Sequence, residues 1–129
     1  MLWAALSAFI MSITGTGDDT FAFRKALERL EEAVEAEVHD TPRRCRAQKT
    51  LVRVRSSFDK HRQRVGKISA CLEKADRTYA VTEADYRRCL SDARPAFAAA
   101  ADELIALDRE FRAGLTPAEY EAVRRSARR

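Results

Sequence analysis

The chain has 129 residues, the length of a single domain with room for a modest core. Its 24 Lys and Arg against 20 Asp and Glu leave a net charge of only +4, so any strongly basic character must be local. Four Gly and three Pro are too few for a turn-rich β fold, and Ala, Arg, Glu and Leu dominate as they do in helical bundles. We therefore expect an all-α protein.

The N-terminal segment is apolar. Residues 1–13 carry no charge and are followed by small residues at 14–17, a pattern that resembles a secretory signal peptide with cleavage after Gly15 or Gly17. No basic residue precedes the apolar run, and the run is shorter than the roughly 20 residues that span a bilayer. A short membrane anchor and a buried N-terminal helix are the alternatives. We expect a periplasmic or secreted protein, with membrane-anchored and cytoplasmic locations left open, in which residues 18–129 form one helical domain.

The first predicted helix runs from Asp19 or Thr20 to about His39, because apolar residues recur on one face of this stretch. Its second half is acidic, which opposes the helix macrodipole and calls for compensating charge on a neighbouring helix. Pro42 follows, and it both disfavours helix at the residue before it and suits the first turn of the next helix.

The second predicted helix occupies residues 43–79. Apolar or small side chains recur there at alternating steps of four and three, interrupted only by His61, which is the heptad seam of a helix that packs on others. The third predicted helix runs from Thr82 to about Ala113 and repeats the pattern. Pro95 lies inside it, and because the seam continues in register we expect a kink there and no break.

The seams of the second and third helices match in one antiparallel register, which places Ile68 opposite Leu90 and His61 opposite Phe97. The first helix matches only the half of this hairpin that lies away from its tip. Residues 62–96 then project beyond it as two helices. The predicted fold is therefore a three-helix bundle base with a long antiparallel coiled-coil hairpin arm and a short C-terminal helix.

The three cysteines fit this register. Cys71 and Cys89 each precede a seam leucine, so both occupy the position that faces its counterpart in an antiparallel coiled coil. We predict a Cys71–Cys89 disulfide if the protein is exported, and two half-buried free thiols if it stays in a reducing cytosol. Cys45 is left over near the first turn. We expect it to be a small buried thiol, and pairing between chains is the alternative.

Chemistry-bearing motifs are scarce. The sequence contains no Gly-rich phosphate loop, no zinc-protease helix motif and no nucleophile elbow, so we expect no enzymatic activity and no cofactor. His39 and Cys45 flank one turn and are the weak candidates for a metal site, although such ligand spacing is unspecific. We interpret His61 as a polar residue tolerated at the rim of the base, with Asp18 or Asp19 near enough to hold it protonated as the alternative.

A basic stripe follows the second helix beside its apolar seam. Such a stripe can track phosphates, but no aromatic residues interleave with it to stack on bases. We expect pairing with the acidic half of the first helix, together with a solvated face. The alternative is binding to nucleic acid or to an anionic membrane. The stripe consists of Arg46, Arg53, Lys60 and Lys67.

Two segments echo each other, Val81 to Tyr86 and Leu115 to Tyr120. Each resembles a degenerate copy of the Leu-Thr-x-x-Gln motif of Spy-like periplasmic chaperones and related heavy-metal-resistance sensors, with Asp85 and Glu119 in place of the Gln. That resemblance implies a small, exported helical hairpin that acts as an envelope chaperone or metal sensor. Both segments also have the form of helix N-caps.

The function that these patterns favour is that of a non-enzymatic, exported or membrane-tethered interaction or structural protein. We expect it to bind a protein partner, or a second copy of itself, through the coiled-coil arm. A basic helical adaptor for nucleic acid or anionic membrane is the second hypothesis, and a Spy-like chaperone or metal sensor is the third.

Overall fold

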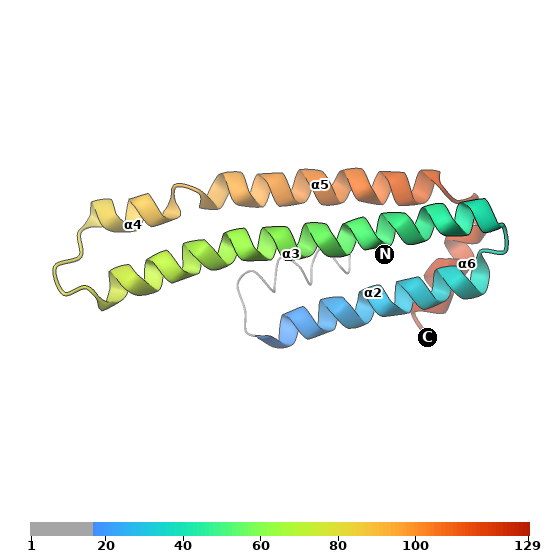
Figure 1. Cartoon of the computed structure of the whole chain (residues 1–129), viewed down its shortest axis with the longest axis horizontal. Coiled ribbons are helices and arrows are strands. Elements are labelled where there is room, and N and C mark those ends of the chain that lie inside the picture. The colour runs from blue at the N-terminus through green and yellow to red at the C-terminus, as the bar shows by residue number, and fades with distance from the viewer. Residues whose placement is uncertain (1–16) are drawn as a thin grey trace.

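The computed structural model describes the backbone of residues 17–129 and the side chains from residue 21 onward. This range contains helices and no strand, which confirms the all-α class (Figure 1). The predicted signal peptide or anchor at residues 1–17 lies, except for Gly17, outside the described residues. The helices are α2 (Gly17–Glu37), α3 (Thr41–Arg77), α4 (Glu83–Leu90), α5 (Ala93–Ala113) and α6 (Pro117–Ala127).

Helix α3 is the longest element, with 37 residues that span about 55 Å. It begins where Asp40 accepts a hydrogen bond from the backbone N–H of Arg43 at 3.0 Å, with Pro42 in the first turn. It ends at Thr78, whose backbone N–H donates to the carbonyl of Ala75. A side-chain cap at its start and a proline with no N–H to leave unsatisfied explain why α3 starts so close to the end of α2.

The predicted continuous third helix is wrong. The helix is interrupted by a turn at Ser91 and Asp92, although both residues keep right-handed helical dihedral angles, so that α4 and α5 are separate helices. Pro95 is the cause, because it has no N–H to donate to the carbonyl of Ser91 and its ring clashes with that carbonyl. The same proline is tolerated in the first turn of α5, where backbone N–H groups have no partner within the helix.

The break changes which side chains are buried. Leu90 and Phe97, both predicted as core residues, are 49% and 39% exposed. Cys89 and Ala96, one residue earlier in each case, are buried instead. A turn inserted between two helices rotates one relative to the other, so a seam extrapolated across it points to the wrong residues. Beyond the break the predicted seam residues of α5 are buried: Ala100, Leu104, Leu107 and Phe111.

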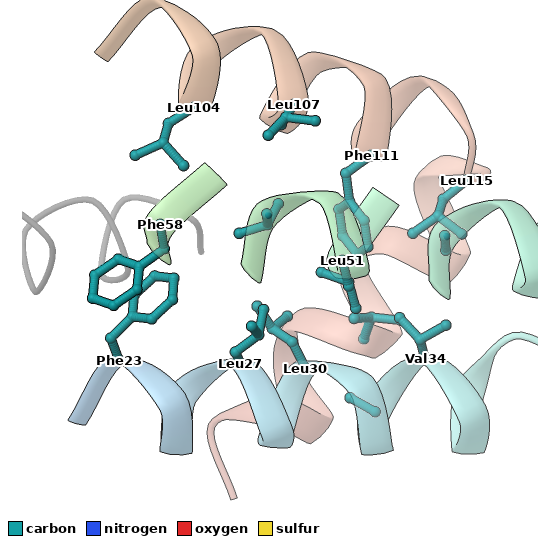
Figure 2. Close-up of a cluster of buried hydrophobic side chains, with 14 of the residues drawn as sticks. Phe23, Leu27, Leu30, Val34, Leu51, Phe58, Leu104, Leu107, Phe111 and Leu115 are labelled. Carbon is teal, nitrogen blue, oxygen red and sulfur yellow. The ribbon is translucent and has the colours of Figure 1, made fainter. Parts of the chain in front are cut away.

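The core lies where α2 and α6 pack beside α3 and α5, at one end of the molecule (Figure 1), and Figure 2 shows its buried apolar side chains. Helix α2 packs beside the first half of α3, and the rings of Phe23 and Phe58 stack with their centroids 3.9 Å apart. Helix α5 runs antiparallel to α3 and packs along it. Helix α6 packs along α2 and buries Val123 completely. The sequence predicts this helix but not the helix on which it packs. We call this part, formed by α2, α6 and the adjoining halves of α3 and α5, the base.

The remaining residues, 62–96, form the arm. Here α2 no longer accompanies α3, which packs only beside α4 and the first turn of α5 (Figure 1). Only Ile68, Cys89 and Ala96 are buried in this range, so the arm has almost no core of its own. Since helices of globular proteins gain most of their stability from packing, the arm needs other restraints.

Candidate functional site

The arm presents large apolar side chains to solvent. Tyr79 lies in the turn between α3 and α4 and is fully exposed. Leu90 lies on α4, and Phe97 lies on α5 one residue beyond the arm; both are exposed. Exposed apolar side chains on a thin projection are accessible for contact with another molecule.

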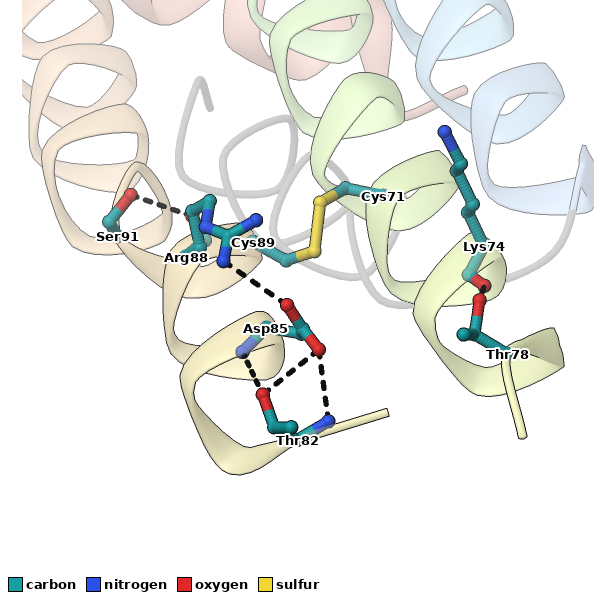
Figure 3. The surroundings of a disulfide bond; sticks show 8 residues. All are labelled: Cys71, Lys74, Thr78, Thr82, Asp85, Arg88, Cys89 and Ser91. Carbon is teal, nitrogen blue, oxygen red and sulfur yellow. Dashed lines mark hydrogen bonds and ion pairs between the residues drawn. A yellow bond between two sulfur atoms is a disulfide. The ribbon is translucent and has the colours of Figure 1, made fainter. Parts of the chain in front are cut away.

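The predicted disulfide is confirmed. Cys71 of α3 and Cys89 of α4 are bonded, with their Cα atoms 5.5 Å apart (Figure 3). The bond joins the two sides of the arm in the antiparallel register expected from the sequence. An open hollow of about 280 Å³ lies beside it, and its wall includes Lys74, Asp85 and Arg88.

The turn of the arm is closed by a capping box at the start of α4 (Figure 3). The backbone N–H and the hydroxyl of Thr82 both donate to Asp85 Oδ2 at 2.9 Å, and the N–H of Asp85 donates back to Thr82 Oγ1 at 3.3 Å. The backbone hydrogen bond from Thr82 is the main cause that lowers the pKa of Asp85. Thr116 and Glu119 form the same box at the start of α6. Both segments of the echoed motif therefore serve as helix N-caps.

A bidentate ion pair holds the junction of α4 and α5 against α3. The guanidinium of Arg64 donates to Asp92, with Nε 2.7 Å from Oδ2. This hydrogen-bonded pairing lowers the pKa of Asp92. Asp92 lies in the turn that the sequence did not predict, so its partner could not be found from the heptad pattern.

The basic stripe is partly paired, and mainly with α5. Arg53 lies 2.6 Å from Glu110 and Lys60 lies 2.7 Å from Glu103. The sequence assigned this compensation to the acidic half of α2 instead. The signal that was missed is the matched spacing, since the two cations and the two acids are each seven residues apart. Across α2 and α3, Arg55 pairs with Glu31 at 2.9 Å.

The other two members of the stripe, Arg46 and Lys67, form no ion pair with the part of the chain that the structure describes. They lie at opposite ends of the stripe, with Arg53 and Lys60 between them. The free positive charge is therefore not continuous along α3.

His61 has a carboxylate partner. It is only 4% exposed, and its Nε2 lies 2.6 Å from Glu103 Oε2, the atom that also accepts from Lys60. The hydrogen bonds from Lys60 and His61 lower the pKa of Glu103, while partial burial acts in the opposite direction. The side chains of Asp18 and Asp19, expected near His61, lie outside the described residues.

The weak metal candidates do not form a cluster. His39 and Cys45 are both exposed near the turn between α2 and α3, and the described side chains, residues 21–129, include no group of three or more His, Cys, Asp or Glu that could hold an ion. The expectation that Cys45 is buried is wrong. It lies in the second turn of α3 on the side away from the seam, where a side chain faces solvent.

No family model matches this chain, and no curated protein or solved structure is significantly similar to it. None of the helices in the described range has both the length and the hydropathy needed to cross a membrane.

Proposed function

We propose that this protein is a non-enzymatic helical interaction protein that binds a protein partner, or a second copy of itself, through its coiled-coil arm. The observation that carries the proposal is the exposure of Tyr79 and Leu90 on the arm, which has only three buried residues, and of Phe97 directly beside it. A coiled-coil hairpin without its own core gains stability when another surface covers it.

Export belongs to the same proposal. The Cys71–Cys89 disulfide supports it, because such bonds persist in the periplasm and outside cells and are rare in the cytosol. The apolar residues 1–13 support it from the sequence.

The other two hypotheses carry no separate proposal. The hypothesis of a basic adaptor is weakened because two of the four stripe cations, Arg53 and Lys60, form ion pairs with α5. The Spy-like chaperone rests on two segments that both act as capping boxes. A client-binding role of the arm would nevertheless be one form of the proposed interaction.

The test compares the arm with the base. Val52 provides the matched control, because it is a 60% exposed apolar residue on the base half of α3. A photo-crosslinking amino acid is placed at Leu90, at Phe97 or at Val52 in the cells that make the protein. Sedimentation equilibrium of the purified chain from about 1 to 100 µM measures self-association.

We expect crosslinked adducts or dimers from Leu90 and Phe97 and few from Val52. In the same assays, Leu90→Glu and Phe97→Glu abolish association, and Val52→Glu does not. A chain that stays monomeric and crosslinks no better from the arm than from Val52 contradicts the proposal.

A further inference from the structure

The tip of the arm depends on one covalent bond. No residue from 72 to 88 is buried, and the only buried side chain of α4 is Cys89 itself. A helix of eight residues is too short to be stable alone in water, so α4 keeps its helical form only while it is held against α3. Apart from the disulfide, the described contacts between the two sides of the tip are weak, such as the 3.5 Å bond from Tyr86 to Asp76.

The two sulfurs differ in access. Cys71 is exposed, whereas Cys89 is 8% exposed. The open hollow beside the bond gives a thiol a route to it, between Lys74 on α3 and Arg88 on α4. Lys74 adds positive charge to the wall of this hollow, while Arg88 is paired with Asp85 at 3.1 Å. The thiolate is the reactive form in disulfide exchange, and it reaches the bond from the exposed side of Cys71.

The structure also sets a limit to what the disulfide controls. The ion pair of Arg64 with Asp92 holds the start of α5 against α3 independently of the bond. Beyond it Ala96 and Ala100 are buried against α3. Loss of the disulfide therefore frees residues 72–90 and leaves α5 and the base in place.

We propose that the Cys71–Cys89 bond is a reversible redox clasp, opened by a dithiol reductant, whose reduction releases α4 from α3. This inference does not rest on the proposed interaction role, because it concerns the arm alone. It makes the shape of the arm tip a function of the thiol redox state of its surroundings.

The chemistry is ordinary thiol–disulfide exchange. A thiolate of the dithiol attacks Cys71 Sγ and forms a mixed disulfide, and Cys89 leaves as a thiolate that takes a proton from water. The second thiolate of the reductant then attacks the sulfur of its own molecule in the mixed disulfide. Cys71 leaves and is protonated, the reductant departs as a cyclic disulfide, and two electrons have passed to the protein.

Hydrogen exchange read by mass spectrometry tests the clasp on the full chain. The Cys45→Ser background leaves Cys71 and Cys89 as the only redox pair. With dithiothreitol, we expect the amides of α4 to exchange at least about tenfold faster, while the amides of α3 beside α2 keep their protection. Oxidised glutathione should restore the slow exchange.

The double variant Cys71→Ser/Cys89→Ser keeps the proposal falsifiable if reductant acts elsewhere. We expect it to exchange like the reduced protein in α4, with or without dithiothreitol. Equal exchange of α4 in the oxidised and reduced protein overturns the clasp. So does an intact mass that shows three free thiols after air oxidation of the wild-type chain.

Discussion

Glu103 of α5 accepts a hydrogen bond at 2.6 Å from His61, which is buried, and one at 2.7 Å from Lys60, which is exposed, through the same carboxylate oxygen. An ionised carboxylate only accepts hydrogen bonds, so Nε2 of His61 carries the proton. The contact joins α3 to α5 about one turn of α3 beyond Phe58, on which Phe23 near the start of α2 stacks. Further along α3 the arm begins. The contact therefore stabilises the boundary between base and arm.

This contact should make stability depend on pH. The pKa of Glu103 is lowered, chiefly by the hydrogen bond from Lys60. A carboxylate with a lowered folded-state pKa contributes stability above its unfolded-state pKa, and that contribution is lost as the pH falls through the folded-state pKa. We expect Glu103→Gln to lower the free energy of unfolding by about 1 kcal/mol at neutral pH.

Urea unfolding followed by circular dichroism from neutral to acidic pH measures this effect. The difference between wild type and Glu103→Gln should shrink as the pH drops below 4.5, the ordinary pKa of a glutamate side chain. Glu83→Gln is the control, because Glu83 pairs with Arg87 within α4 and is 78% exposed. A difference that stays constant with pH would show that ionisation of Glu103 does not contribute.

The stack of Phe23 on Phe58 should dominate the core. Both side chains are almost fully buried, so we expect Phe23→Ala to cost about 3–4 kcal/mol in the free energy of unfolding. The double variant should cost less than the two single variants together, because the rings are neighbours. Phe21→Ala is the control, and with its ring 64% exposed it should change stability by less than about 0.5 kcal/mol. Chemical denaturation of the wild type, the two single variants, the double variant and Phe21→Ala measures these differences.

Replacing Ser57 by alanine should increase the stability of the protein. Its hydroxyl is buried and has no hydrogen-bond partner in the described structure. Ser57→Ala removes an unsatisfied polar group and improves helix propensity, so we expect about 1 kcal/mol of added stability. The neighbouring exposed Ser56→Ala should gain only the propensity part, up to about 0.5 kcal/mol. Equal thermal midpoints for the two variants would mean that burial of the Ser57 hydroxyl costs nothing.

The two capping boxes should differ in their effect on global stability. Thr116→Ala removes the cap of α6, which packs on α2 in the base, and should cost about 1 kcal/mol. Thr82→Ala removes the cap of α4, which lies outside the core, and should leave the unfolding midpoint of the base nearly unchanged. Hydrogen exchange should instead show faster opening of α4 in Thr82→Ala. A large loss of global stability in Thr82→Ala would show that the tip and the base unfold as one unit.

Gly66 should be a weak point that can be repaired. It lies inside α3, and a Cβ at this position would have nothing within 4 Å. Gly66→Ala should therefore stabilise the helix by up to about 1 kcal/mol. Gly114→Ala is the contrast, since its Cβ would lie 3.4 Å from the carbonyl oxygen of Glu110. Hydrogen exchange measures this effect. The amides of α3 in the arm should exchange more slowly in Gly66→Ala than in the wild type, and at an unchanged rate in Gly114→Ala.

Much of the fold could be predicted from the heptad seams. The seams of α3 and α5 around Leu51 and Leu107 could be read because continuous helices keep their periodicity. The register also placed Cys71 beside Cys89. The prediction failed where local chemistry interrupts the period. Pro95 prevents α5 from continuing α4, and the seam residue Leu90 on the far side of the break is exposed.

Polar partners were harder to predict than the core. Glu103 and Asp92 contact α3 from the flanks of the seam, where the heptad pattern allows many side chains. The position of α6 was not predictable either. Its apolar residues show that it must bury a face, but a short helix after a turn can fold back onto more than one neighbour, and only tertiary packing decides that it lies on α2.

The packing of α2 against α6 also decides when the molecule can finish folding. These two helices are the first and last of the described chain, so the part of α2 that packs on α6 lacks its cover until α6 has been synthesised. At typical rates of translation the interval between the two helices is roughly 5 to 20 seconds. During that time the nascent chain presents an uncovered apolar face, which is the form that holding chaperones and export machinery can engage.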